Sequence, residues 1–428
     1  MYVTHVEIEN VRSIRTLNWD VTPEAAPGWH VILGDNGSGK SSFLRAIALA
    51  LVGPDDVHGL RQSGDEWLNK GEATGGVGVE FTRDPDLDPL AGPGAPAREY
   101  VSYLRLARDD SGVSLGIDDS RVVRGKKLQR SIWAPQSRGW FSAGFGPYRR
   151  FTGGEADSSN LADKIPRLAR YLSLFDEKFA LFDALEWLSD LKFTQLSSGS
   201  ATFNRVKQFV NQPGFLPNGV ALEDVPRPKV VLFRDGSGAQ IPVQQLSDGF
   251  RSILSLALEL IRHLVLSYGE DAVFAGTDPT QVQVPGVVLI DEVDVHLHPT
   301  WQRTVASWFV RAFPRMQFIV STHSPLVCQG VDRCSVFVLP STAGGPGRFL
   351  TDDEKSRLVF GNVLDALATG AFGVGVAQSD AGKQHLERLA DLNATELEGS
   401  LTPDELVERE RLRAILPSNA SRLADGAK

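Results

Sequence analysis

The chain has 428 residues, of which 42% are hydrophobic and 23% are charged, a balance typical of globular proteins. It excludes disordered and fibrous classes and leaves room for one large domain with insertions or for two domains. Because the net charge is −9, no overall basic field attracts the molecule to nucleic acid or to anionic membranes, so any such contact must be local.

Several features of the sequence favour a cytoplasmic protein. Its two cysteines, Cys328 and Cys334, are too few for a disulfide framework or a four-ligand zinc site. The first residues alternate like a strand and lack the apolar core of a signal peptide. The longest apolar run, residues 253–266, is interrupted by charged side chains and is too short to span a membrane. We therefore expect no membrane association.

The first predicted elements form a strand, loop and helix unit. Strand patterns at residues 2–11 and 28–34 precede a glycine-rich turn and the apolar helix 41–53. In residues 56–219, loops rich in glycine and proline alternate with short strands, and an amphipathic helical tract follows from about 160 to 210. No heptad pattern is sustained there, so we do not expect a long coiled coil.

Strand signals return after residue 229. Two buried-strand patterns, residues 284–292 and 316–323, lie on either side of the helix 300–313. Near-continuous Val, Ile and Leu with helices between the strands is typical of a parallel sheet covered on both faces. Further on, Thr402 and Glu405 have the spacing of a capping box at the start of a polar helix. The pattern as a whole predicts an α/β fold.

Residues 34–41, with the sequence GDNGSGKS, match the phosphate-binding loop pattern in full, between a buried strand and a helix as the motif requires. The glycines allow successive backbone N–H groups to turn toward an anion at a helix N-terminus. Lys40 would hold the β- and γ-phosphates and Ser41 the Mg²⁺ ion. A solvated glycine-rich turn is the alternative, and the complete match argues against it. The candidate ATP-binding residues are Gly34, Asp35, Asn36, Gly37, Ser38, Gly39, Lys40, Ser41 and Ser42.

Two adjacent acidic residues end the strand 284–292. Neighbouring residues of a strand point to opposite faces, so the two carboxylates can take different roles. Asp291 would support Mg²⁺ through water, and Glu292 would act as the general base that polarises the attacking water. Taken alone, an Asp-Glu strand end is more often a solvated turn, but beside a phosphate loop the catalytic interpretation is favoured.

His323 ends the next buried strand. A neutral imidazole at that position can reach the γ-phosphate or the attacking water, so His323 is a second candidate catalytic residue. The alternative is a histidine that caps the strand end through backbone hydrogen bonds.

The phosphate loop, a Leu-Ser-Asp-Gly helix start, the Asp-Glu strand end and the His strand end occur in the order of the ABC class of ATPases, which the chain resembles. The resemblance implies that Ser247, Asp248 and Gly249 are a variant of the ABC signature. In that family the signature binds the γ-phosphate of ATP held by the phosphate loop of a second subunit. It therefore implies a homodimer, or a higher even oligomer, that sandwiches ATP and Mg²⁺ between two copies.

Other segments resemble the SMC-like, RecF-like and OLD-like branch of AAA-labelled ATPases rather than transporters. The first 50 residues are similar to the start of those proteins, and this implies that Arg12, in the first hairpin, approaches the nucleotide. Residues 291–299, DEVDVHLHP, resemble an extended motif of the same relatives, with His298 in place of the D-loop aspartate of transporters. No clear Q-loop is present, and Gln136 is the candidate for it.

A stand-alone ATPase of this size, without the acidic set of a TOPRIM nuclease, resembles the ATPase subunits of bacterial anti-phage systems such as Septu or PARIS. That resemblance implies an effector partner, with a nuclease as the expected kind. Two alternatives stay open: a DNA-repair ATPase of the RecF or SMC type that acts directly on DNA, and, less favoured, a transporter ATPase subunit. A neighbouring nuclease gene would favour defence, and DNA-stimulated turnover of the chain alone would favour repair.

Residues 121–150 carry eight basic and no acidic side chains, with aromatic residues among them, and are the one stretch that resembles a nucleic-acid contact. A solvated face or an acidic partner protein would suit the segment equally. Arg149 and Arg150 have another interpretation, contact with the nucleotide, because they follow a Gly-Phe-Gly turn. The candidate contacts are Arg121, Arg124, Lys126, Lys127, Arg130, Arg149 and Arg150.

Together these features predict an α/β P-loop ATPase head of the ABC type with two additions. The head is expected in residues 1–55 and 220–340. Residues 56–219 would be an insertion of strands and helices, and residues 341–428 a mostly helical C-terminal region whose role the sequence leaves open.

Overall fold

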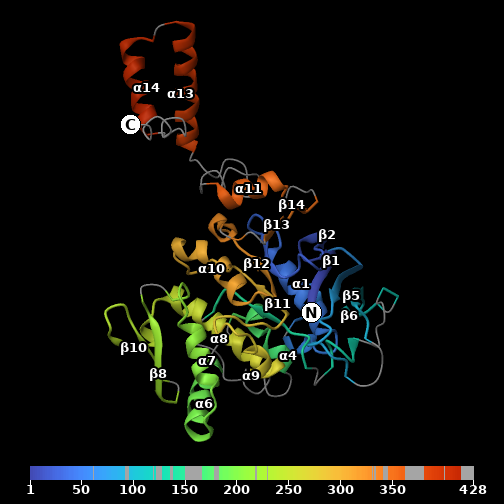
Figure 1. Cartoon of the computed structure of the whole chain (residues 1–428). Helices are drawn as coiled ribbons and strands as arrows, with labels where there is room; N and C mark the ends of the chain where they lie inside the picture. Colours follow the sequence, from blue (N-terminus) through green and yellow to red (C-terminus); the bar gives the residue numbers. More distant parts are fainter. Residues whose placement is uncertain are drawn as a thin grey trace. The chain divides into compact units, whose positions relative to one another are not determined.

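The computed structural model divides into two compact units, residues 1–363 and 364–428, which are described separately (Figure 1). The described residues are 1–60, 62–91, 96–118, 120–121, 128–134, 138–149, 166–177, 183–216, 219–228, 230–329, 331, 334–340, 346–361, 380–399 and 401–415. Within them, no helix has both the length and the apolar character needed to cross a membrane.

The N-terminal unit is built on a six-stranded sheet in the order β14, β13, β3, β12, β11, β7. All neighbouring strands are parallel except the edge pair β13 and β14. Every residue of β3, β7, β11 and β12 is buried, and the runs of Val, Ile and Leu predicted this for β3, β11 and β12. The predicted parallel sheet is confirmed. Its strands are β3 (Gly28–Leu33), β7 (Ser142–Phe145), β11 (Gly286–Ile290), β12 (Met316–Ser321), β13 (Cys334–Val338) and β14 (Arg348–Phe349).

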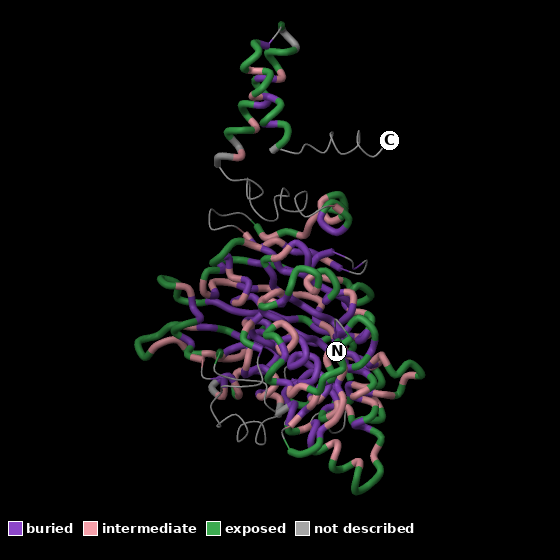
Figure 2. The backbone as a smooth tube through the Cα atoms, turned by 90° about the vertical axis from the view of Figure 1, so that its left-hand side faces the viewer, coloured by how far each residue is buried: buried purple, intermediate pink, exposed green. Residues whose placement is uncertain are grey.

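A second, antiparallel sheet has the order β2, β1, β4, β5, β6. Helix α1 (Lys40–Val52) contacts strands of both sheets, and eleven of its thirteen residues are buried. A helix that is apolar nearly all round is stable only when it is enclosed in this way. The buried chain runs through the middle of the unit in Figure 2. The strands of this sheet are β1 (Tyr2–Val11), β2 (Ile14–Asp20), β4 (Thr74–Thr82), β5 (Glu99–Asp109) and β6 (Gly112–Ile117).

The opposite face of the parallel sheet is covered by α10 (Pro299–Ala312). On β3, Trp29 stacks on Phe309 of α10, while the neighbouring His30 packs edge-on against Trp19 of β2. Adjacent strand residues point to opposite faces, so the sheet has helix α10 on one side and the α1 layer on the other. Helices on both faces were expected from the sequence and are present.

The region 56–219 contributes strands to both sheets of the head. Strands β4, β5 and β6 form one sheet with β1 and β2, and β7 is the edge strand of the parallel sheet beside β11. The sequence had placed these strands in an insertion. The difference arises because strand partners far apart in the chain leave no local signal. These strands are therefore integral to the head.

Helices of the same region pack on the helix that opens with Leu-Ser-Asp-Gly, α8 (Asp248–Tyr268). Glu259 of α8 is buried, accepts a 2.9 Å hydrogen bond from the backbone N–H of Ala184, and pairs with Arg262 at 2.8 Å. A small sheet, β10 (Gln240–Pro242), β9 (Val230–Arg234) and β8 (Ala221–Arg227), lies nearby. The other described helices are α4 (Pro166–Ala169), α5 (Leu172–Phe175), α6 (Asp183–Ser198), α7 (Thr202–Val210), α9 (Glu270–Val273), α11 (Asp352–Phe360) and the 3₁₀ turns η1 (Val57–Leu60), η2 (Gly64–Glu66), η3 (Val243–Gln245) and η4 (Pro325–Cys328).

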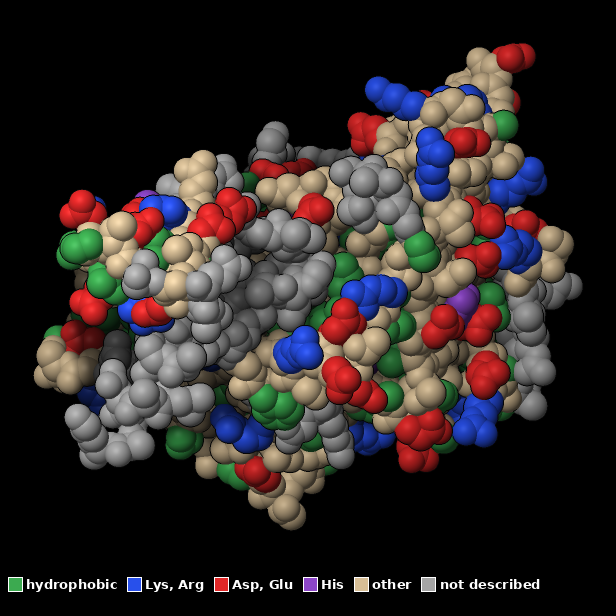
Figure 3. All heavy atoms as spheres, turned by 90° about the horizontal axis from the view of Figure 1, so that it is seen from above, with side chains coloured by type: hydrophobic (Ala, Val, Ile, Leu, Met, Phe, Trp, Pro, Cys, Tyr) green, Lys and Arg blue, Asp and Glu red, His purple; other side chains and the backbone are tan. Residues whose placement is uncertain are grey.

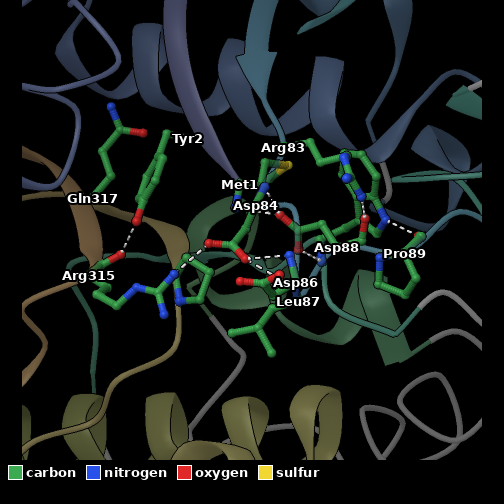
Figure 4. Close-up of polar contacts among 12 residues, drawn as sticks. Met1, Tyr2, Arg83, Asp84, Asp86, Leu87, Asp88, Pro89, Arg315 and Gln317 are labelled. Atoms are coloured by element: carbon green, nitrogen blue, oxygen red, sulfur yellow. Dashed lines mark hydrogen bonds and ion pairs between the residues drawn. The ribbon is translucent and has the colours of Figure 1, made fainter. Parts of the chain in front are cut away.

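A buried polar cluster ties the two sheets together at the start of the chain (Figure 4). The α-amino group of Met1 lies 2.6 Å from the carboxylate of Asp88, and neither group is exposed. Asp88 also accepts hydrogen bonds from the backbone N–H groups of Asp84, at 2.8 Å, and Trp140, at 2.6 Å. Arg315, just before β12, pairs with Asp84 at 2.5 Å. A buried charge needs this degree of pairing, because isolated it would destabilise the fold.

The second unit contains helices α13 (Asp380–Glu398) and α14 (Pro403–Ile415). Thr402 and Glu405 form the predicted capping box, in which the Glu405 carboxylate accepts from the Thr402 N–H at 2.9 Å and the Thr402 hydroxyl accepts from the Glu405 N–H at 3.4 Å. The C-terminal region that was predicted at residues 341–428 is divided between the two units, because β14 and α11 belong to the first unit. A small leucine core joins the two helices: Leu389, Leu392, Leu401 and Leu412.

Candidate nucleotide site

The phosphate loop connects β3 to α1, and its backbone requires glycine. Gly37 and Gly39 have positive φ values of 80° and 100°. A Cβ atom on Gly39 would lie 3.0 Å from Ser13 and Ile14 in the turn between β1 and β2. No side chain caps the N-terminus of α1. Its first N–H groups are therefore free to bind an anion.

Lys40 is folded back over this loop. Its ammonium group donates hydrogen bonds to the carbonyls of Gly34, at 2.8 Å, and Asp35, at 3.0 Å. Burial lowers the pKa of Lys40, while the negative charges of Asp291 and Glu292 oppose that shift. Because β3, which leads into the loop, and β11 both pair in parallel with β12, the loop and the end of β11 lie at the same edge of the sheet. Lys40 can exchange its two carbonyl partners for phosphate oxygens, which are stronger acceptors for an ammonium group.

An unsatisfied hydroxyl in the loop also fits a phosphate ligand. The Ser38 Oγ atom is buried and has no hydrogen-bond partner in the described structure. A buried polar group without a partner costs about 1–3 kcal/mol. A phosphate oxygen would be an acceptor for this hydroxyl, so the loop residues suit the nucleotide that the sequence predicted.

Asp291 and Glu292 follow the last residue of β11, beside the end of β12. Asp291 is 2% exposed and accepts a 2.5 Å hydrogen bond from the hydroxyl of Ser321. The same hydroxyl oxygen accepts from the backbone N–H of Glu292 at 2.8 Å. Glu292 is partly exposed and has a φ of +46°, which a side chain rarely adopts and which marks a strained position. The parallel pairing of β11 and β12 thus fixes both carboxylates at the edge where the phosphate loop lies.

The residues after β12 reinforce this arrangement. Thr322 donates a 2.6 Å hydrogen bond to Asp294, and Ser324 donates one of 2.6 Å to Gln302 of α10. His323 lies between these two anchored residues with its side chain exposed. Its position beyond the strand end leaves the imidazole free to meet a ligand at this edge of the sheet.

The magnesium candidates are Ser41, partly buried in the first turn of α1, and Asp291. Among the described residues, no three or more His, Cys, Asp or Glu side chains form a metal cluster. Mg²⁺ keeps several waters and takes one or two protein ligands together with substrate phosphates, and Ser41 and Asp291 are ligands of that kind.

Arg12 lies in the β1–β2 turn that contacts the phosphate loop. Its guanidinium stacks over the Trp67 ring at 4.1 Å and its Nε donates to the carbonyl of Glu66 at 3.3 Å. Burial, followed by the nearby charge of Arg45 on α1, lowers the Arg12 pKa. The turn is therefore adjacent to the loop, and Trp67 and Glu66 hold the Arg12 side chain.

Ser247, Asp248 and Gly249 lie at the start of α8, beside a cavity that the phosphate loop does not line. Ser247 is exposed and makes no capping hydrogen bond. A Cβ atom on Gly249 would lie 2.6 Å from the carbonyl oxygen of His296, so glycine permits this close approach. None of the described residues 34–42 lines the adjacent cavity of about 650 Å³. Its walls are Ser247, Asp248, Gly249, Phe250, His296, Leu297, His298, Thr300 and Trp301.

His298 takes a structural position in this cavity wall. It is the N-cap of α10, and its Nδ1 accepts a hydrogen bond from the Thr300 N–H at 3.3 Å. The residue that the sequence resemblance places at the D-loop position of transporters therefore starts a helix here.

The structure contradicts the nucleic-acid interpretation for Arg149. Its side chain is 4% exposed and donates hydrogen bonds to the carbonyls of Asp291, Glu292 and Val293. No nucleic acid can reach a guanidinium at that depth. Sequence reasoning missed this contact because a basic residue after a strand end carries no signal of burial.

Among the other described residues of the segment, Arg121 is engaged by side chains of the same chain. Arg121 pairs with Glu7 at 2.6 Å and lies over the ring of Tyr103. The aromatic residues Trp133, Trp140 and Phe141 are buried and so cannot stack on bases. Arg130 is exposed. On the face shown in Figure 3, acidic and basic side chains are interspersed over the described surface. Arg124, Lys126, Lys127, Gln136 and Arg150 lie outside the described residues.

Comparisons with known proteins show which families and relatives the chain is similar to. Residues 92–329 match the family model “AAA domain, putative AbiEii toxin, Type IV TA system”, and residues 5–139 match a second AAA-domain model. Over 385 residues the chain is 27% identical to Septu protein PtuA of Bacillus mycoides (strain KBAB4), which covers 87% of this chain and 45% of the relative. Over 162 residues it is 32% identical to the Retron Ec83 probable ATPase of Escherichia coli, covering 37% of this chain and 27% of the relative.

The chain spans less than half the length of these two relatives. A solved structure of an SMC head bound to the C-winged helix domain of ScpA is similar over 82% of this chain and 98% of that chain, with 16% identity and a TM-score of 0.46.

Proposed function

We propose that this chain, which belongs to the family “AAA domain, putative AbiEii toxin, Type IV TA system”, is an ATPase that binds and hydrolyses ATP with Mg²⁺. One observation carries the proposal. The phosphate loop with its buried Lys40 and the Asp291–Glu292 pair meet at the carboxyl edge of one parallel sheet, where ligands of open α/β sheets bind.

The chain's own residues have distinct roles in this proposal. ATP, when bound, supplies the phosphoryl group that is transferred to water. Lys40 and the first N–H groups of α1 hold the phosphates, and Ser41 with Asp291 holds Mg²⁺. Glu292 orients the attacking water and accepts its proton, and the exposed His323 contacts the same region. Ser321 keeps Asp291 and Glu292 in a fixed relation through its two hydrogen bonds.

We further propose that two copies close around the nucleotide. The exposed Ser247 hydroxyl and the uncapped N–H groups of α8 are suited to an anion. The cavity beside them receives no residue from the chain's own loop at 34–42. A phosphate held by the loop of a second copy would complete this half-site, as the resemblance to ABC ATPases implies.

The biological role that we propose is anti-phage defence, with ATP binding or hydrolysis controlling a separate effector such as a nuclease. The support is the similarity to a Septu protein and to retron probable ATPases. Direct action on DNA is less favoured, because Arg149 is buried and Arg121 already pairs with Glu7.

Mass photometry of Glu292→Gln tests this proposal. With ATP and Mg²⁺ the variant should double its mass, because it binds ATP and does not hydrolyse it. The matched control, Lys40→Ala in the same background, should stay at the starting mass with ATP. A Glu292→Gln protein that remains monomeric at saturating ATP would contradict the sandwich.

A further inference from the structure

Arg149 is a buried cation at the centre of the candidate site, and none of the proposed catalytic steps involves it. It follows β7 by four residues and donates five hydrogen bonds from one guanidinium. The acceptors and distances are Gly146 O at 3.0 Å, Asp291 O at 3.0 Å, Glu292 O at 3.1 Å, Val293 O at 3.3 Å and Ser252 Oγ at 3.3 Å.

None of these acceptors is a carboxylate. Burying a cation costs free energy unless hydrogen bonds and nearby charges compensate it. Burial lowers the Arg149 pKa to about 10, and the charges of Asp291, Asp294 and Glu292 oppose that shift. The side chain therefore stays protonated at neutral pH. A nonpolar side chain of the same volume would leave the carbonyls around it without this donor, so the arginine is needed to hold the surrounding backbone.

The pattern of acceptors identifies that function. In an extended strand successive carbonyls point in alternating directions, so three in a row do not converge on one group. The carbonyls of residues 291–293 do converge on Arg149, and Glu292 between them has a φ of +46°. A strained backbone persists only where its surroundings hold it. Arg149 holds this turn from its carbonyl side, while Ser321 binds the Asp291 carboxylate and the Glu292 N–H.

The same guanidinium also reaches the signature helix. Ser252, its fifth partner, is buried on α8 one turn beyond Gly249. Gly249 in turn packs against the carbonyl of His296. The start of α8 and the segment after β11 are thus joined at two points, and a shift of α8 would move Arg149 and with it the Glu292 turn.

We propose that Arg149 is a positioning residue that fixes the backbone of Glu292 for proton transfer and couples it to the signature helix α8. The proposal rests on the proposed function, because Glu292 is the assigned base. Arg149 acts through Glu292 and does not touch the nucleotide.

The central test is Arg149→Lys, which keeps the positive charge and loses the planar set of donors. We expect kcat for ATP hydrolysis to fall about 10- to 100-fold, because a small misplacement of a catalytic group has an effect of that order. The Kd for a fluorescent ATP analogue, measured without turnover, should stay within about twofold, since a residue that acts only through Glu292 leaves ground-state binding unchanged. The matched control is Arg303→Lys at an exposed position of α10, which should change neither.

A double-mutant cycle separates positioning from general damage. If Arg149 acts through Glu292, Arg149→Lys should not reduce the residual turnover of Glu292→Gln any further. An equal fall in both backgrounds, an unchanged kcat, or a parallel loss of ATP binding would overturn the proposal.

A second variant decides the matter if Arg149→Lys does not fold, as judged by its thermal unfolding. Ser252→Ala leaves the guanidinium in place and removes its link to α8. A lower kcat with an unchanged Kd would support coupling, and a wild-type kcat would overturn it. Failure of the proposed function itself would give a different result. Either the wild-type chain would not bind ATP, or the Glu292→Gln variant would keep the wild-type turnover.

Discussion

The hydroxyl of Ser321 donates a 2.5 Å hydrogen bond to Asp291 Oδ1 while its oxygen accepts one of 2.8 Å from the Glu292 N–H. One side chain at the end of β12 therefore fixes both acidic residues at the end of β11. A phosphate loop supplies binding for a nucleotide, but hydrolysis also requires a carboxylate at a defined position near the transferred group. Ser321 contributes to that position from the neighbouring strand.

Ser321→Ala should weaken the Mg²⁺-dependent step more than nucleotide binding. Groups that orient a metal ligand change metal affinity or activity about 10- to 100-fold when they are removed. The two lost hydrogen bonds should also lower the free energy of unfolding by about 1–3 kcal/mol, because Asp291 and the Glu292 N–H lose a partner. Mg²⁺ titration of ATP hydrolysis and urea unfolding measure the two effects. Ser198→Ala, at the exposed end of α6, is the control, and equal Mg²⁺ dependence in both variants would count against the role given to Ser321.

Gly249→Ala should separate ATP binding from dimer formation. The added Cβ atom would lie 2.6 Å from the His296 carbonyl oxygen, so the start of α8 must move. We expect Kd for ATP to stay near the wild-type value and ATP-dependent doubling of mass in the Glu292→Gln background to be lost. Gly116→Ala in β6, whose Cβ atom would meet nothing within 4 Å, is the matched control. Normal dimer formation by Gly249→Ala would show that the signature turn has no part in it.

The elements that the sequence predicted well are those whose evidence is local. The loop at 34–41, the strands around Asp291 and His323, and the capping box of Thr402 each lie in one short segment with its own pattern. The contacts that the sequence could not reveal join distant segments. Arg149 lies 142 residues before Asp291 and Ser321 lies 30 residues after it, and only the strand order brings them together.

Burial was the second property that local pattern could not supply. The basic stretch 121–150 and its aromatic residues fit a nucleic-acid surface by composition. In the fold, Trp140 packs edge-on against Tyr100, and Arg149 lies under the Glu292 turn. A basic residue is buried when enough acceptors converge on it, and the convergence of three carbonyls from the segment after β11 depends on the tertiary structure.

Complementation between two defective chains tests whether the site is shared. Lys40→Ala removes phosphate binding from one copy, and Ser247→Arg places a bulky cation at the signature of the other. Each variant alone should be inactive, whereas in a mixture half of the heterodimer's sites lack both defects. ATP turnover of a 1:1 mixture should therefore exceed that of either variant. A mixture no more active than its components would argue that the phosphate loop and signature do not act in trans.

His30 gives the fold a defined pH dependence that is independent of the nucleotide site. The imidazole is buried on β3, where its Nε2 donates to the carbonyl of Ala26 and its Nδ1 accepts from Ser335, each at 2.8 Å. Burial lowers the His30 pKa to about 4 from a usual value of 6.5, with the hydrogen bond to Ala26 acting in the opposite direction. In the unfolded chain His30 is therefore protonated as the pH falls below 6.5, whereas in the folded chain it stays neutral until about pH 4. The contribution of His30 to the free energy of unfolding is fully present above pH 6.5. It falls by about 3 kcal/mol as the pH decreases through this window.

Urea unfolding between pH 4 and 8 measures this effect. His30→Gln should unfold more readily than the wild type at pH 8, because the amide does not reproduce both hydrogen bonds. Its free energy of unfolding should also depend less steeply on pH between 6.5 and 4, by about one bound proton. The buried His263, whose pKa is lowered by burial and by Arg262, stays in both proteins and adds the same slope to each. Ser198→Ala, at the exposed end of α6, is the control and should keep the wild-type slope. Equal slopes for His30→Gln and the wild type would mean that His30 does not remain neutral in the folded chain.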